Sequence, residues 1–235
     1  MKKICVVFFT FKRAILLDYA INALIKYAGH LIAYPINIIY HYDKTHHESY
    51  RYLEKKYKSK VKFFKRSKKT LLPNFFKFFR ILNLFWFIRY PAMLKNFDNF
   101  KDILEKILTI KKHNLVMLCT DDTIFYKKVK INSYVLNKII KNKKYFFRTN
   151  FGLGLKGLYK AKKNSFKFYG NKKSNLIFWH SKDKNLNLHM KYHFQVEGAI
   201  YHKKSLLNFL SPILYHNPVT LEAIGFREAK LRGFF

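Results

Sequence analysis

Short apolar runs alternate with helix-like stretches near the N-terminus, and this alternation limits the fold more than any other feature of the sequence. Residues 4–9 (ICVVFF) form a continuous run of β-branched and aromatic residues, which is typical of a strand buried on both faces. Apolar residues within 14–28 then recur at the spacing of an amphipathic helix. The same alternation continues with a strand, a polar helix and a third strand, at 36–41, 47–57 and 61–64. The order β-α-β-α-β predicts an α/β fold with a mostly parallel central sheet flanked by helices.

The rest of the chain continues the pattern less regularly. Its clearest parts are a helix over 98–110, a strand over 115–119 and a helix over 133–141. The weaker expectations are a strand at 144–149, a glycine-containing loop at 150–157, a strand at 175–180, a turn, strand and helix within 196–210, and an extended segment followed by a helix within 216–229. A length of 235 residues without an evident linker predicts a single domain over 1–235.

The charge is strongly positive, at +34, and comes from 39 Lys and 8 Arg against 13 acidic residues. Three explanations stay open: a coding bias toward AT-rich codons, an anionic membrane surface or phosphorylated substrate, and nucleic acid. The segment 71–94 interleaves aromatic and basic residues, which suits a helix in a bilayer interface as well as a core helix. The lysine-rich stretch 55–69 is typical of a solvated face.

No stretch reaches the roughly 20 apolar residues of a membrane span. The first apolar run lacks a small-residue cleavage site and fits a strand better than a signal peptide. The two cysteines lie in apolar runs and are expected to be buried and reduced. We therefore expect a cytoplasmic protein, with the inner face of the membrane as a candidate docking surface.

Polar residues follow three of the expected strands at the end where α/β sheets bind ligands. Thr10 and Arg13 follow the first strand, Asp43 follows the second, and Asp121 and Asp122 follow the strand at 115–119. Adjacent carboxylates repel each other unless a cation offsets their charge. Mg²⁺ or Mn²⁺ bound by one or two carboxylates and by substrate phosphates would do so. The alternative is that Asp121 caps a helix or turn and that its neighbour is solvated.

These residues resemble the GT-A class of nucleotide-sugar glycosyltransferases. An aspartate ends the second strand, an aspartate pair ends a later strand, and a T-x-x-R sequence follows the first. Four further motifs occur in the order found in a group of small bacterial glycosyltransferase-like proteins: TDDTIF (120–125), NFGLGLKG (150–157), VEGAIYHKKSLL (196–207) and NPVTLE (217–222). The chain departs from that pattern at Thr120, where a strict D-x-D has its first carboxylate, and at Glu197, where Asp is usual. The loop arginine of the family has no clear counterpart, and Gly152 stands near its place.

The resemblance implies a single GT-A-like domain with a nucleotide-binding half (1–125) and an acceptor-side half (126–235). It implies transfer of a sugar from a nucleotide-diphosphate donor to a saccharide or lipid-linked acceptor in cell-envelope polysaccharide synthesis, assisted by Mn²⁺ or Mg²⁺ on Asp121 and Asp122. Glu197 is the first candidate for the catalytic base and Glu222 the second. The implied nucleotide-sugar-binding residues are Thr10, Arg13, Asp43, Asp121, Arg148, Gly152 and Gly154.

Two other functions compete with this interpretation. A basic nucleic-acid-binding protein would present stacking aromatics and Lys or Arg on an exposed sheet. The aspartate pair would repel phosphate in that case, so the sequence disfavours nucleic acid as a partner. A catalytically idle subunit of an envelope assembly would tolerate the imperfect D-x-D.

Overall fold

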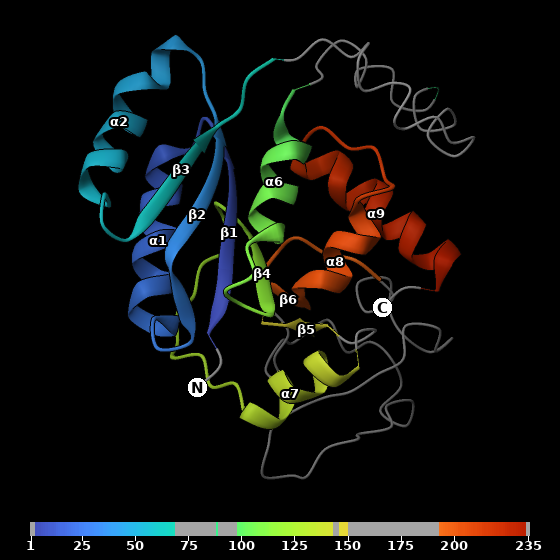
Figure 1. Ribbon diagram of the computed structural model, residues 1–235. Helices are drawn as coiled ribbons and strands as arrows, with labels where there is room; N and C mark the ends of the chain where they lie inside the picture. Colours follow the sequence, from blue (N-terminus) through green and yellow to red (C-terminus); the bar gives the residue numbers. More distant parts are fainter. Residues whose placement is uncertain (1–2, 69–87, 89–97, 143–145, 150–192, 234–235) are drawn as a thin grey trace, which may run out of the picture.

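The computed structural model describes residues 3–68, 88, 98–142, 146–149 and 193–233, and a six-stranded mixed sheet forms its centre (Figure 1). The strand order is β3-β2-β1-β4-β6-β5. Four neighbouring strands run parallel: β1 (Ile4–Phe11), β2 (Ile32–His41), β3 (Val61–Lys65) and β4 (Leu115–Thr120). The strand β6 (Ala199–His202) runs antiparallel to β4 and to the two-residue β5 (Phe147–Arg148). The α/β class is confirmed, and the parallel arrangement holds for one side of the sheet only.

Helices cover both faces of this sheet, because the side chains of each strand alternate between two hydrophobic clusters. Val6 and Phe8 of β1 pack in the cluster that contains residues of α1 (Ala14–Ala28), α2 (His47–Lys56) and α7 (Ser133–Lys141). Val7 and Phe9 pack in the cluster that contains α6 (Phe100–Thr109), α8 (Lys203–Leu210) and α9 (Pro218–Arg232). A short 3₁₀ helix, η1 (Lys44–His46), connects β2 to α2.

Most element boundaries agree with the sequence-based expectations to within a few residues. The helices expected at 14–28 and 133–141 have those bounds in the structure. The strand expected at 36–41 begins four residues earlier, at Ile32. The segments 71–94, 150–157 and 175–180 lie outside the described residues, apart from residue 88, so the interfacial helix, the glycine loop and the additional strand stay predictions.

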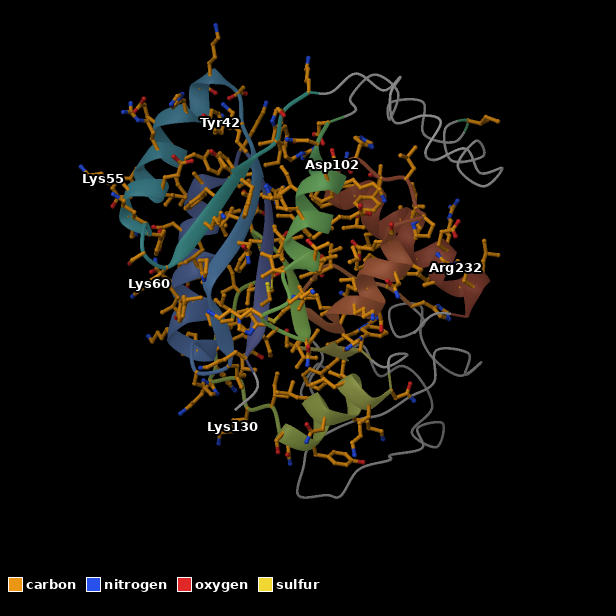
Figure 2. All side chains as sticks on the ribbon, viewed as in Figure 1. Tyr42, Lys55, Lys60, Asp102, Lys130 and Arg232 are labelled. Carbon is orange, nitrogen blue, oxygen red and sulfur yellow. The ribbon has the colours of Figure 1, made fainter. Side chains whose placement is uncertain are left out.

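The charged surface follows the expected distribution in part. Lys55, Lys60 and Lys130 are exposed and lie at the periphery of the molecule (Figure 2). Arg66, from the same lysine-rich stretch as the first two, has a side chain only 10% exposed, so the assignment of 55–69 to a solvated face is wrong at this residue. Among the described residues, no helix has the length and apolar character needed to cross a membrane.

Candidate functional site

A cleft of about 550 Å³ lies at the carboxyl ends of the parallel strands. One wall comes from the ends of β1 and β4 and includes Thr10, Asp121 and Asp122. The other wall comes from segments that are distant in sequence: the residues after β3, the residues before α6, and the first residues of α9. Residues that follow three different strands therefore meet one helix start in a single cavity.

The wall at β1 and β4 is held together by Asp121. Its backbone N–H donates to the Phe9 carbonyl oxygen at 3.1 Å, which fixes the turn after β4 against β1. The Thr10 hydroxyl donates to Asp121 Oδ2 at 2.8 Å and is 3.0 Å from the Tyr50 hydroxyl. Burial raises the pKa of the Asp121 carboxyl, and the Thr10 hydrogen bond and the Arg13 charge oppose that rise.

Asp122 differs from Asp121 in being exposed to the cleft. Its side chain is 57% exposed, against 7% for Asp121. The Thr120 hydroxyl donates to Asp122 Oδ1, and the Thr123 backbone N–H donates to the Thr120 carbonyl in a tight turn. The following helix, α7, is capped by Asn132 and not by either aspartate. Helix capping is therefore wrong for Asp121, whereas its place in a turn and the solvent exposure of Asp122 are as that alternative expected.

Arg13 supplies the cation next to both carboxylates. Its Nη1 is 3.4 Å from Asp121 Oδ1 and 3.8 Å from Asp122 Oδ2, and its side chain is 56% exposed. Exposed ion pairs of this kind contribute roughly 0–1 kcal/mol, so the guanidinium can leave at low cost.

The carboxylates fit a metal that a substrate helps to bind. No group of three or more His, Cys, Asp or Glu side chains that could hold a metal occurs in the described part of the chain. Two neighbouring carboxylates with hard oxygen donors suit Mg²⁺ or Mn²⁺ when phosphate oxygens and water complete the coordination. Such an ion would replace Arg13 between Asp121 and Asp122.

Asp43 lies apart from the cleft lining. Lys12 Nζ is 2.7 Å from its Oδ2, and the Thr45 hydroxyl and the His46 Nδ1 are each 2.6 Å from its Oδ1. The hydrogen bond from Lys12, followed by those from Thr45 and His46, holds the pKa of the Asp43 carboxyl well below its usual range. A nucleoside bound there would have to compete with three protein donors.

Glu197, Glu222 and Arg148 form a second group beside β5 and β6. Burial, and then the charge of Glu197, raise the pKa of Glu222 to about 7, while the Val196 backbone N–H and Arg148 oppose the rise. Burial lowers the pKa of Arg148 to about 10. Glu197 itself is exposed. None of the three side chains lines the cleft.

The second group is connected to the aspartate turn through Gly198. Leu118 pairs with Ala199 as the last pair of the antiparallel ladder, so Glu197 and Gly198 directly precede the start of β6 beside the end of β4. Gly198 has a φ of +64°, and an added Cβ would collide with Thr149 Oγ1 and contact Thr123 Cγ2 at 3.6 Å. The glycine is therefore required by close protein packing. The other predicted glycines, Gly152 and Gly154, lie outside the described residues.

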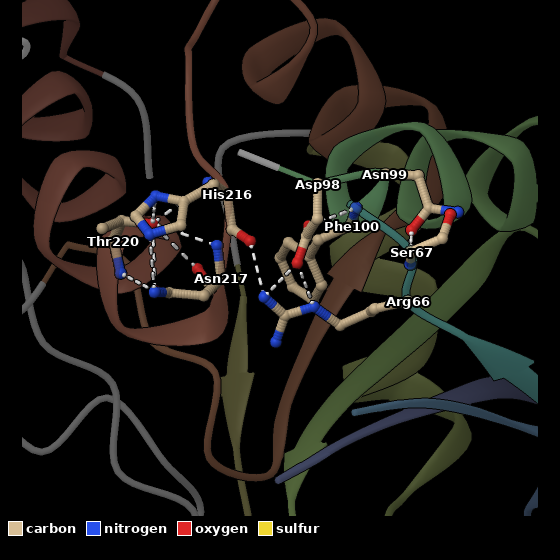
Figure 3. A network of polar contacts seen from close by, with 8 residues as sticks. All are labelled: Arg66, Ser67, Asp98, Asn99, Phe100, His216, Asn217 and Thr220. Atoms are coloured by element: carbon tan, nitrogen blue, oxygen red, sulfur yellow. Dashed lines mark hydrogen bonds and ion pairs between the residues drawn. The ribbon is translucent and has the colours of Figure 1, made fainter. Parts of the chain in front are cut away.

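The opposite wall of the cleft contains residues that sequence reasoning did not identify as functional (Figure 3). Arg66 Nε donates to Asp98 Oδ2 at 2.8 Å, and Nη2 donates to the His216 carbonyl at 3.0 Å. Asn217 caps α9, since its side chain accepts from the Thr220 N–H at 2.8 Å. The NPVTLE motif marked this helix start in the sequence, but no local signal separated Arg66 from the lysines around it.

Phe11 and His41 complete the floor between the two walls. Their rings are stacked at 5.5 Å between centroids with an interplanar angle of 9°. Phe11 is 50% exposed and lines the cleft, and Lys12 Nζ lies 5.1 Å from its ring centroid.

No protein-family model and no curated protein matches the chain. A solved structure that resembles it is 4-diphosphocytidyl-2C-methyl-D-erythritol synthase from Anaerococcus prevotii DSM 20548. The identity is 9%, the match covers 99% of this chain and 83% of that one, and the TM-score is 0.44. Likeness at this level carries no argument about activity, and the functional assignment rests on the site itself.

Proposed function

We propose that the chain is a glycosyltransferase that uses a nucleotide-diphosphate sugar and a divalent metal. The observation that carries the proposal is the exposed Asp122 carboxylate beside the buried Asp121, at the rim of a cleft that also contains Thr10 and Arg13. A strand-end carboxylate pair that faces a cavity suits the binding of a metal-diphosphate complex.

Each residue of the wall has a distinct proposed role. Asp122 and Asp121 would hold Mn²⁺ or Mg²⁺, with the Asp121 carboxylate kept in place by Thr10. A metal at this place would supply positive charge for the departing diphosphate. Arg13, displaced from the carboxylates, pairs with phosphate oxygens. The exposed ring of Phe11 supports the nucleobase by stacking.

The base that removes the acceptor proton is proposed to be Glu197, with Glu222 next to it. Glu197 is exposed and lies two residues before Ala199 of β6, which pairs with Leu118 near the end of β4. Glu222 has a pKa of about 7, which is suited to proton transfer near neutral pH, but it is more deeply buried.

The acceptor is proposed from the sequence resemblance to be a saccharide or a lipid-linked saccharide of the cell envelope. The segments that would contact it, including Gly152, Gly154 and residues 71–94, lie outside the described residues except for residue 88. Location in the cytoplasm, with the inner membrane face as a docking surface, belongs to the same proposal.

A panel of nucleotide sugars tests the proposal. Binding and hydrolysis are measured with and without Mn²⁺ for wild type, Asp122→Ala and the control Glu48→Ala, which removes an 83%-exposed carboxylate outside the cleft. We expect wild type and the control to bind a donor in a metal-dependent way, and Asp122→Ala to lose at least tenfold in affinity, the effect of about 1.4 kcal/mol. A wild type that binds no donor, or an unchanged Asp122→Ala variant, refutes the metal-diphosphate role.

The nucleic-acid alternative is less well supported by the fold. It predicts aromatic residues on an exposed sheet, but helices cover both faces of the sheet where the structure describes it (Figure 1). Salt-sensitive binding of DNA or RNA by the wild type, without donor binding, would favour it.

A further inference from the structure

The strongest feature that the proposed function leaves unused is the buried guanidinium of Arg66. The Arg66 side chain is 10% exposed and lines the cleft, and its Cζ lies 5.3 Å from the Phe100 ring centroid. Nε and Nη2 are occupied by Asp98 and the His216 carbonyl. The remaining terminal nitrogen, Nη1, carries two N–H groups that have no acceptor among the described residues (Figure 3). Nη1 is not among the fully buried atoms without a partner in the described residues, so solvent reaches it and it can donate to a group bound in the cleft.

Two other positive groups line the same end of the cleft. Lys68 is exposed, and its ammonium has no acidic partner among the described residues. The helix α9 starts at this wall, and Pro218 at its first position has no N–H. The Val219 N–H has no acceptor in the described part of the chain, whereas the Thr220 N–H is capped by Asn217. A 15-residue helix presents partial positive charge at its first turn, where anions bind favourably.

The charges at this end leave a net positive balance. Asp98 is offset by Arg66, and its second oxygen accepts from the Phe100 N–H at 2.8 Å. Lys68 is therefore a surplus cation. The acids of the other wall follow β4, whereas Arg66 and Lys68 follow β3, and β1 and β2 lie between. Three interstrand spacings separate the two strand ends by about 14 Å, so the cleft has an acidic end and a basic end.

We propose that the basic end is a second oxyanion-binding subsite, formed by Arg66 Nη1, the Lys68 ammonium and the Val219 N–H. It binds a phosphate or carboxylate group of a substrate other than the metal-bound diphosphate. Asp98 and the His216 carbonyl fix the orientation of the Arg66 guanidinium, so Nη1 is preorganised for a charge-assisted hydrogen bond to such a group. The subsite needs no metal, and its existence does not depend on sugar transfer at the other end.

A titration with inorganic phosphate tests the subsite in the absence of divalent metal, with EDTA present and at low ionic strength. Affinity is measured by isothermal titration calorimetry on wild type, Lys68→Gln and Lys60→Gln. Lys60 is exposed and precedes β3, so its substitution removes the same charge from the opposite end of the strand (Figure 2). We expect Lys68→Gln to weaken phosphate binding about tenfold, as for loss of one charge-assisted contact, and Lys60→Gln to leave it within twofold.

Arg66→Lys keeps the positive charge and removes the planar guanidinium. We expect it to weaken phosphate binding at least as much as Lys68→Gln, and thermal unfolding identifies a variant that has lost its fold. If Arg66→Lys does not fold, the comparison of Lys68→Gln with Lys60→Gln decides the question alone. Equal weakening by those two variants would mean diffuse attraction to a basic surface, and would overturn the proposal, as would wild-type phosphate binding too weak to measure.

Two further sets of phosphate-binding measurements identify the class of ligand and distinguish this subsite from the proposed metal site. Acetate and methyl phosphate replace inorganic phosphate as probes, and Lys68-dependent binding of one of them identifies a carboxylate or a phosphate ester as the ligand. If neither probe shows Lys68-dependent binding, a substrate-borne oxyanion is excluded.

Asp122→Ala is expected to retain metal-free phosphate binding within twofold. Loss of donor binding in Asp122→Ala with retained phosphate binding supports both sites, and absence of donor binding in the wild type refutes only the proposed activity.

Discussion

Replacement of Glu222 by Gln should make the protein more resistant to unfolding at neutral pH, by an amount that depends on pH. Burial and the neighbouring Glu197 raise the pKa of Glu222 from an ordinary 4.5 to about 7. Between these values the folded protein binds a proton that the unfolded chain has released, so the free energy of unfolding falls as pH rises. The rise in pKa from 4.5 to about 7 corresponds to a loss of about 3.4 kcal/mol in the free energy of unfolding, because each pKa unit is worth about 1.4 kcal/mol. Partial exposure of the side chain reduces this to about 2 kcal/mol.

Urea unfolding of wild type and Glu222→Gln at intervals from pH 4.5 to 8 measures the effect. The two proteins should differ least near pH 4.5, where the folded carboxyl is protonated and the unfolded carboxyl is only about half ionised. The difference should grow through pH 6 and level off above pH 7, in favour of the Gln variant. Glu197→Gln serves as an internal check, since removal of its charge should lower the pKa of Glu222 and end the decline in stability at a lower pH. A stability difference that stays constant across the range would refute the raised pKa.

Two more predictions concern the aspartate turn and its neighbour. Arg13→Gln removes the cation between the two carboxylates, so Mn²⁺ binding without nucleotide should tighten severalfold in calorimetry, since an exposed pair of this kind is worth roughly 0–1 kcal/mol; weaker Mn²⁺ binding would place the metal elsewhere. Gly198→Ala should lower the free energy of unfolding by about 2–3 kcal/mol, from backbone strain and the collision with Thr149. Gly233→Ala is the matched control, because it has a similar φ of +62° with nothing within 4 Å, and equal losses in both variants would rule out the packing argument.

The fold of the N-terminal half could be predicted because its signals are local. The apolar run at 4–9 and the helical spacing at 14–28 reflect burial of neighbouring residues, and each element can be identified from its own sequence. The direction of β6 could not be predicted in this way. It is set by pairing with β4 over a sequence separation of about eighty residues, and a four-residue strand has no periodicity that indicates its direction.

The same distinction between local signals and contacts over long sequence separations applies to the candidate site. Thr10, Arg13 and Asp121 meet because parallel strands bring their carboxyl ends to one edge, which follows from the order of the elements alone. Asp43 ends the second strand as expected, but Lys12 adopts a φ of +57° and pairs with it, a local conformation that composition does not reveal. The Arg66 wall depends on segments up to 150 residues apart in sequence.

The two aspartates after β4 differ in burial and in their contacts. This difference explains why a chain so poor in acidic residues places them together. Asp121 is buried, accepts from Thr10 and fixes the turn to β1 through its backbone N–H, so its cost of burial is offset by contacts within the protein. Asp122 is exposed, and beyond the Thr120 hydroxyl and the half-exposed guanidinium of Arg13 it has no partner among the described residues. Contacts within the protein therefore account for the presence of Asp121, but they do not account for Asp122. In the proposed site, a cation would meet the exposed Asp122 first, and Asp121 is held next to it by Thr10.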